Sequence, residues 1–327
     1  MSEVSIVDNN LFYTKKGKPV ELPVSLAPLA DTHGHLTSFR KLEAAHAVAR
    51  AALAGVRLLV APVDPADDVQ DAAEFLRWFK NVLIDAKKLL EQAESEGLVP
   101  PEHKSFGHLP PLTSNTYFVA GVHPYGAQKF MEDSSVRVRL EELLKSPGCV
   151  GVGEFGLDYG PWNNLPADVQ EQAFRAQLRI AHERGLPVEL HLRDGNNDTR
   201  AHDDALRVLR EEGVPAAGCD LHCFTSGPEV MEPFVELGCH IAFGGAATFS
   251  RSDDIRAAAA TCPQELLLSE TDSPYMAPMP LRGQECEPAM VAFSVARIAQ
   301  TREESSGIEQ RKTYEALWNN ANAFFEL

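Results

Sequence analysis

Residues 149–191 read CVGVGEFGLDYGPWNNLPADVQEQAFRAQLRIAHERGLPVELH, an apolar run followed by a helical repeat and a second apolar run. Asp168 and Glu171 have the spacing of a capping box, and Gly185 can provide a left-handed stop at the end of the helix. Short apolar runs that alternate with helical repeats are typical of parallel βα units. This stretch therefore predicts a strand, a helix and a second, parallel strand.

The same alternation recurs along the chain and predicts eight strands. They are Ala27–Asp31, Val56–Val63, Thr116–Val122, Cys149–Glu154, Pro187–His191, Gly218–His222, His240–Gly244 and Leu266–Glu270. Eight parallel strands with intervening helices close a (β/α)8 TIM barrel. The sequence therefore predicts an α/β protein of that class.

Two segments are expected to add to a single barrel domain that spans residues 1–327. Residues 1–26 are predicted to form a peripheral hairpin or cap, and residues 64–115 a helical insertion between the second and third strands. Within the insertion, residues 67–96 carry apolar residues at coiled-coil spacing, before Pro100-Pro101 stops the helix. This helix is either a lengthened barrel helix or a contact between two copies of the chain.

Composition excludes several classes of protein. The chain has 327 residues, 44% of them hydrophobic, and a formal net charge of −17, so it can bury a large core and has no overall basic surface for nucleic acid. It shows no apolar run of membrane-spanning length and no leader pattern, so a cytoplasmic location is expected. Its six cysteines include no CxxC pair, which predicts reduced thiols.

Metal-binding residue types occupy the ends of five predicted strands. They are His33 and His35 after strand one, Glu154 at strand four, His191 at strand five, His222 at strand six and Asp272 after strand eight. The carboxyl ends of barrel strands meet at one rim, where the chemistry of such enzymes takes place. Alternate residues of an extended segment point the same way, so His33 and His35 can hold one cation. The pattern predicts a metal site.

Six such groups exceed the needs of one tetrahedral ion, and the carboxylate of Glu154 can bridge two cations with its two oxygens. We therefore expect two divalent metal ions per chain. Imidazole ligands favour Zn²⁺, Mn²⁺ or another transition ion such as Ni²⁺ over Mg²⁺. The sequence alone does not identify the ion.

The chain resembles the TatD-related metal-dependent hydrolases, a branch of the amidohydrolase-like barrels. The resemblance is carried by six segments: Asp31-Thr32-His33-Gly34-His35, Gly121-Val122-His123-Pro124, Gly153-Glu154-Phe155-Gly156-Leu157-Asp158-Tyr159, His191-Leu192-Arg193-Asp194, His222-Cys223-Phe224-Thr225-Ser226-Gly227 and Glu270-Thr271-Asp272-Ser273-Pro274-Tyr275. It implies that His33, His35, Glu154 and Asp272 hold one metal and that Glu154, His191 and His222 hold the second. It also implies hydrolysis of phosphodiester bonds in DNA.

One segment departs from that family. Where relatives typically show Arg-Gly-Lys-Arg-Asn-Glu-Pro, this chain keeps Arg282 and Gly283 but has Gln284, Glu285 and Cys286 in place of two basic residues and an amide. The change removes positive charge beside the expected entrance and weakens the case for a long polynucleotide. DNA or a short nucleotide is the expected partner.

Asp272 and Glu154 are the predicted catalytic residues, and Asp272 is expected to orient and deprotonate a water molecule. The candidates for substrate contact are His123, Arg193, Thr225 and Ser273. All four have structural alternatives: His123 can stabilise a turn, Arg193 can pair with Asp194 or another surface carboxylate, and threonine and serine are also ordinary loop-capping residues.

Three functions remain open at this point. The first is a metal-dependent phosphodiesterase or deoxyribonuclease. The second is a hydrolase of a carboxylic amide, ester or lactone on the same metals, supported by the acidic change at residues 284–286. The third is a barrel that binds metal without turnover. The scattered Trp78, Trp162 and Trp318 predict no base-stacking platform.

Overall fold

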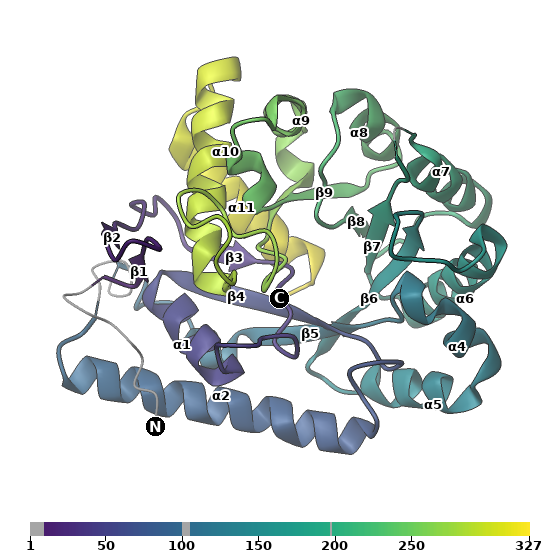
Figure 1. The fold of residues 1–327 in the computed structure, drawn as a ribbon, viewed down its shortest axis with the longest axis horizontal. Helices are drawn as coiled ribbons and strands as arrows, with labels where there is room; N and C mark the ends of the chain where they lie inside the picture. The colour runs from purple at the N-terminus through teal and green to yellow at the C-terminus, as the bar shows by residue number, and fades with distance from the viewer. Residues whose placement is uncertain (1–9, 100–104, 197) are drawn as a thin grey trace.

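The structure is a computed structural model that describes residues 10–99, 105–196 and 198–327. Eight parallel strands form one sheet in chain order, surrounded by helices (Figure 1). The strands are β3 (Leu29–Asp31), β4 (Val56–Val63), β5 (Thr116–Ala120), β6 (Cys149–Asp158), β7 (Val188–Arg193), β8 (Cys219–Leu221), β9 (His240–Phe243) and β10 (Leu267–Ser269). All eight predicted strands are present, and the predicted (β/α)8 barrel is confirmed.

Helices connect the successive strands and cover the outside of the barrel (Figure 1). They are α1 (Ala44–Leu53), α2 (Ala72–Ser95), α4 (Ala127–Glu132), α5 (Ser134–Leu143), α6 (Ala167–Arg184), α7 (Arg200–Glu212), α8 (Pro228–Val235), α9 (Asp253–Thr261), α10 (Val291–Ser306) and α11 (Gln310–Phe324). Their apolar faces pack on the strands in one large buried cluster, and a second, smaller cluster includes Leu58, Val60 and Val119 of β4 and β5. The strand ends are thereby held in fixed positions around one rim.

Hydrogen bonds join the first and last strands of the barrel. The N–H of Thr32 donates to the carbonyl of Ser269 (3.0 Å), and the Ser269 hydroxyl donates to the carbonyl of Ala30 (2.9 Å). Beyond the strands, the N–H of Asp272 donates to the carbonyl of His33 (2.8 Å). The closure therefore places the segment after β3 directly beside the segment after β10.

Two glycines allow β5, β6 and β7 to approach closely inside the barrel. A Cβ atom on Gly121 would lie 2.8 Å from the backbone of Gly153, and one on Gly153 would lie 2.7 Å from the Cβ of Glu189. Real Cβ atoms do not tolerate such contacts, so any larger residue would push the strands apart. Gly121 and Gly153 thus allow the close packing of the segments that carry His123, Glu154 and Glu189.

The predicted capping box of α6 is wrong. The helix begins at Ala167, and its N-cap is Pro166, whose side chain has no oxygen to accept a hydrogen bond. Asp168 lies in the first turn, where its negative charge interacts favourably with the positive end of the helix dipole. Glu171 forms an ion pair with Arg175 (2.8 Å). The stop is confirmed, because Gly185 adopts the left-handed conformation (φ 64°) at the end of α6.

The long helix of the insertion begins later than the apolar repeat predicted. The Asp71 carboxylate accepts the N–H of Glu74 (2.7 Å), so α2 starts at Ala72, and residues 67–71 precede the helix. Its apolar face packs inside the chain, with the rings of Phe75 and Phe79 each 5.4 Å from that of Phe118 in β5. This packing is the arrangement of a lengthened barrel helix.

The N-terminal segment forms a small hairpin beside the barrel. Strands β1 (Phe12–Tyr13) and β2 (Pro19–Val20) pair antiparallel, and the ring of Phe12 packs edge-on against Phe293 at 5.7 Å. Residues 1–9 of the expected extension lie outside the described residues, as does the Pro100-Pro101 stop.

None of the helices in the described part of the chain has the length and apolar character needed to cross a bilayer. The six cysteines form no disulfide with one another, and five of them are buried.

Candidate metal centre

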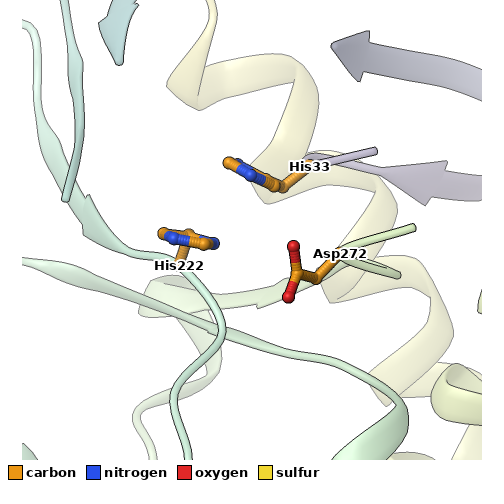
Figure 2. Close-up of side chains that lie close together, drawn as sticks. All are labelled: His33, His222 and Asp272. Carbon is orange, nitrogen blue, oxygen red and sulfur yellow. The ribbon is translucent and has the colours of Figure 1, made fainter. Parts of the chain in front are cut away.

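The six predicted metal-binding residues meet at the carboxyl ends of the strands. His33 and His35 follow β3, Glu154 lies in β6, His191 lies in β7, and His222 and Asp272 follow β8 and β10. Figure 2 shows that the side chains of His33, His222 and Asp272 come from separate segments and face a common space. Four overlapping groups of potential ligand atoms lie here, each with its atoms within 4.8 Å of one another.

Glu154 lies between two pairs of histidines. Its Oε1 atom lies 3.3 Å from Nε2 of His35 and 3.9 Å from Nε2 of His33. Its Oε2 atom lies 2.8 Å from Nε2 of His222 and 3.2 Å from Nδ1 of His191. Each oxygen of one carboxylate thus faces its own pair of imidazoles, which is the arrangement of a bridging ligand.

Asp272 completes the His33–His35 side of this arrangement. Its Oδ1 atom lies 3.6 Å from Nε2 of His35, and a carboxylate oxygen also groups with His33 and His222. The residue has a left-handed backbone (φ 53°), which is uncommon outside glycine and clusters at functional sites. Its side chain is 15% exposed, close to the values for His35 (14%) and His191 (18%), so these three residues form the partly accessible edge of the centre.

Two further carboxylates orient the histidines from behind. Oε2 of Glu189 lies 3.0 Å from Nδ1 of His33, and Oδ2 of Asp158 lies 3.2 Å from Nε2 of His191. A hydrogen bond from the outer ring nitrogen to such a partner leaves the lone pair of the inner nitrogen facing the centre. Neither residue is among the site residues predicted from the sequence.

Both carboxylates had a signal in the sequence. Glu189 stands two residues before His191 and Asp158 four residues after Glu154, so each shares a face with a predicted ligand in an extended strand. Both lie in strands that are otherwise largely apolar, where a carboxylate needs a polar partner.

The charges of the centre perturb its titrating groups strongly. Burial lowers the pKa of His33 well below its ordinary value. Burial alone would raise the pKa of Glu154, but the charge of His222 and hydrogen bonds from His191 and His222 outweigh it and hold the pKa well below normal. Burial lowers the pKa of His191, whereas its bonds to Asp158 and Glu154 prevail and raise it to about 9. Glu154 is therefore ionised at neutral pH.

The donor set fits divalent cations. Nε2 of His33 and Nε2 of His35 lie 3.3 Å apart, and Nδ1 of His191 and Nε2 of His222 lie 3.2 Å apart. Two imidazole nitrogens at this separation can share at most one proton, so in each pair at least one nitrogen presents a lone pair beside an ionised carboxylate oxygen, and a cation would displace the shared proton. Imidazole and carboxylate are the ligands that transition ions such as Zn²⁺ accept.

His123 stands next to the His191 side of the centre. Its ring lies 4.3 Å from that of His191, and its Nδ1 accepts the N–H of Tyr125 (3.2 Å). Burial, followed by the charge of His191, lowers the pKa of His123 to about 3. The neutral ring therefore carries its proton on Nε2. The residue also caps the turn at Pro124. His123 therefore stabilises a turn, as its structural alternative predicted, and also lies beside the candidate metal centre.

Arg193 does not pair with Asp194, which instead binds His202 at 2.6 Å. The guanidinium of Arg193 lies over the indole of Trp162, 4.2 Å from the ring centroid. Trp162 is 68% exposed. The structure thus places an exposed aromatic ring and a cation together beside the strand that carries His191.

The two remaining substrate candidates differ in accessibility. Thr225 is exposed in the loop after β8. Ser273 has no exposed surface in this structure, and its predicted contact with substrate stays a prediction. Its carbonyl accepts the N–H of His35 (2.8 Å), and its own N–H donates to Thr271 (3.2 Å). The backbone of Ser273 thus joins the segments after β10 and β3.

Residues 284–286 have structural roles that their charge did not predict. The Glu285 carboxylate accepts the backbone N–H groups of Arg40, Lys41 and Leu42 at 2.9–3.1 Å. Gln284 donates to the carbonyl of Tyr13 (3.0 Å), and Cys286 is fully buried. The negative charge of Glu285 is therefore hydrogen-bonded into the loop before α1.

Comparison with known proteins gives a consistent family. A model of the family described as TatD related DNase matches residues 30–326. The chain is 35% identical to the metal-dependent hydrolase YabD of Bacillus subtilis (strain 168) over 187 residues, which is 57% of this chain and 70% of YabD. It is 32% identical to the 3'-5' ssDNA/RNA exonuclease TatD of Escherichia fergusonii over 245 residues, 73% of this chain and 86% of that protein.

A solved structure agrees with these sequence matches. The crystal structure of YJJV, a TatD homolog from Escherichia coli K12, superposes with a TM-score of 0.68 and 25% sequence identity. The superposition covers 92% of this chain and 99% of YJJV.

Proposed function

This chain belongs to the family of TatD-related DNases and is a metal-dependent hydrolase, and on that premise we propose that it hydrolyses phosphodiester bonds of DNA or short nucleotides. The observation that carries the proposal is the position of Glu154, whose two carboxyl oxygens face two separate pairs of imidazoles. Such a centre would hold two cations, which can stabilise both the attacking and the leaving oxygen in phosphodiester hydrolysis. We further propose that residues 1–327 form one catalytic domain.

The ligands divide between two sites that share Glu154. His33, His35, Glu154 and Asp272 would hold one divalent ion, and Glu154, His191 and His222 the other. Zn²⁺, Mn²⁺, Ni²⁺ and Mg²⁺ are the candidates, with the imidazole-rich donor set favouring the transition ions. When bound, these ions supply an activated water and stabilise negative charge on the phosphoryl oxygens.

Asp272 is the proposed general base. Its carboxylate stands at the edge of the centre and retains some exposure, so an oxygen can accept the proton of the attacking water. The same group can then return that proton to the leaving oxygen. Glu154, by contrast, is held ionised between the histidines, which suits it to a permanent ligand rather than a proton carrier.

His123 and Arg193 are the proposed contacts for the phosphate. The neutral His123 ring can donate its Nε2–H to a phosphoryl oxygen without adding charge that would repel a metal. Arg193 offers a planar guanidinium, the geometry that binds phosphate with two parallel hydrogen bonds. Trp162, against which Arg193 stacks, can receive a nucleobase on its exposed surface. Thr225 is a further candidate from the loop after β8.

The alternative of amide, ester or lactone hydrolysis loses its support. It depended on a more acidic entrance at residues 284–286, yet the Glu285 carboxylate is bonded to three backbone N–H groups. The relatives named ssDNA/RNA exonuclease favour a nucleic-acid substrate.

The test is cleavage of 5′-labelled single-stranded DNA by the Mn²⁺- or Mg²⁺-loaded protein. We expect shortening of the strand, and Asp272→Ala should lower its rate by about 10³-fold because the proton acceptor is lost. Asp254→Ala, at an exposed position in α9, is the matched control and should leave the rate unchanged. Equal rates for wild type and Asp272→Ala, or an inert phosphodiester beside a cleaved amide or lactone, would reject the proposal.

A further inference from the structure

The turn of the N-terminal hairpin concentrates positive charge on an acidic protein. Lys15, Lys16 and Lys18 are exposed between β1 and β2, and none of them pairs with a carboxylate of the described residues. The net charge of the whole chain is −17, so three neighbouring lysines contrast with the negative charge of the protein as a whole. The hairpin also precedes the part of the chain that the family model matches, which begins at residue 30.

Specific contacts hold this hairpin against the loop that leads to α10. Gln284 donates to the carbonyl of Tyr13 (3.0 Å) at the end of β1. The side chain of Lys15 lies against Gly283, because a Cβ atom added to that glycine would stand only 2.9 Å from Nζ of Lys15. Figure 1 shows the hairpin at the same side of the molecule as this loop.

Three more cations adjoin the same loop. Arg40 and Lys41 are exposed, and their backbone N–H groups are bound by Glu285. The guanidinium of Arg282 lies over the ring of Phe249 at 4.2 Å. We call Lys15, Lys16, Lys18, Arg40, Lys41 and Arg282 the basic rim. The one acidic side chain bonded within it, Glu285, has its carboxylate occupied by backbone N–H groups.

The basic rim continues to the metal centre. The N–H of Cys286 donates to the carbonyl of Pro274 (3.0 Å), which ties the loop to the segment after β10. The neighbouring Tyr275 is 54% exposed, and its ring meets that of His35 edge-on at 6.0 Å. An exposed aromatic ring thus stands between the rim and the proposed metal ligands.

We propose that the basic rim binds the phosphate backbone of single-stranded nucleic acid whose reacting end occupies the metal centre. This inference rests on the proposed function and extends it, since it assigns a preference for strands long enough to reach the hairpin. Clustered lysine and arginine side chains bind phosphates and release counterions, which gives affinity without sequence preference. The overall negative charge confines that attraction to one path.

The test compares K15E/K16E/K18E with wild type on a labelled 20-nucleotide strand and on a tetranucleotide. We expect kcat/KM on the 20-mer to fall by more than about tenfold at low salt, and its dependence on log salt concentration to weaken by about 2 units, three contacts at ~0.7 each. The tetranucleotide, which does not reach the hairpin, should be cleaved at an unchanged rate. K80E/K87E/K88E on α2 is the matched control and should resemble wild type on both substrates.

Fluorescence anisotropy of the same 20-mer separates this inference from the proposed function, because it measures binding without turnover. Weaker binding by K15E/K16E/K18E supports the basic rim even if the wild type cleaves no DNA. The inference is overturned if the wild type does not bind the 20-mer, or if the hairpin variant binds it as tightly as wild type does. Equal losses on the tetranucleotide or in the α2 control overturn it as well.

Discussion

Nε2 of His191 lies 3.2 Å from Oδ2 of Asp158, whereas its Nδ1 atom faces Glu154 and His222. This bond directs Nδ1 of His191 towards Glu154 and His222, where a metal ligand is needed. It also has an electrostatic cost for metal binding, because the two carboxylates raise the pKa of His191 to about 9 despite its burial.

Metal binding should therefore release a proton from His191. Below pH 9 the metal-free ring is protonated, and a cation can bind Nδ1 only after that proton leaves, so affinity rises with pH by about tenfold per unit between pH 7 and 9. Calorimetry in buffers of different ionisation enthalpy measures the release. Asp158→Asn should lower the pKa and reduce proton release at pH 7, whereas Asp203→Asn in α7 should not. Identical proton release in wild type and Asp158→Asn would show that Asp158 does not cause the raised pKa of His191.

Removal of the metal ions should abolish activity without unfolding the protein. The barrel strands satisfy their hydrogen bonds within the sheet, so removal of metal by EDTA should abolish hydrolysis and leave the far-ultraviolet circular dichroism spectrum nearly unchanged. The melting temperature should fall, because ions that bind only the folded state stabilise it. Loss of helical signal together with metal would contradict this account.

Trp162 should contribute to substrate binding more than to chemistry. Trp162→Ala removes the surface against which Arg193 stacks, a contact worth about 0.5–1 kcal/mol at an exposed site, and a platform for a base. We expect KM for single-stranded DNA to rise several-fold with little change in kcat, and Trp162→Phe to retain most of the affinity. Val138→Ala, also at an exposed apolar position, serves as the control. An unchanged KM would exclude Trp162 from the substrate path.

A buried ion pair should control stability away from the centre. Arg50 in α1 binds Glu287 through two hydrogen bonds of 2.7 and 2.8 Å, with both side chains at most 10% exposed. Glu287→Leu removes the carboxylate that neutralises the buried guanidinium and should cost about 3–5 kcal/mol in the free energy of unfolding. The double variant Arg50→Met/Glu287→Leu should recover part of that loss.

The exposed pair of Lys88 and Asp85 provides the comparison for that experiment. These side chains lie 2.7 Å apart and are more than half exposed, so Lys88→Met should change the free energy of unfolding by less than about 1 kcal/mol. Denaturant unfolding measures all of these variants. A cost for Glu287→Leu no larger than that for Lys88→Met would show that the buried pair is dispensable.

The barrel and its ligands were predictable because they leave local signals. Each strand is a short apolar run, and residues such as His191 and His222 fall where a run ends, so placing the strands also places them at one rim. The helix stop at Gly185 is equally local. The start of α6 was not predictable from a local signal, because Pro166 begins the helix through its backbone conformation and makes no side-chain hydrogen bond.

Residues whose roles depend on distant partners were not predictable in the same way. Glu285 was interpreted as a charge at the entrance, but its carboxylate is bound by N–H groups some 245 positions earlier in the chain. Ser273 was predicted to contact substrate from its place in the loop after strand eight, and the closure between β10 and β3 buries it. Trp162 was dismissed for its distance in sequence from the other tryptophans, although its partner is Arg193.

The most direct test of the central claim, that Glu154 bridges two cations, is anomalous diffraction from crystals of the Zn²⁺-loaded protein. Two peaks about 3.5–4 Å apart are predicted, one beside His33 and His35 and the other beside His191 and His222, each about 2 Å from a different oxygen of Glu154. A single peak, or two peaks of which neither contacts Glu154, would contradict the account.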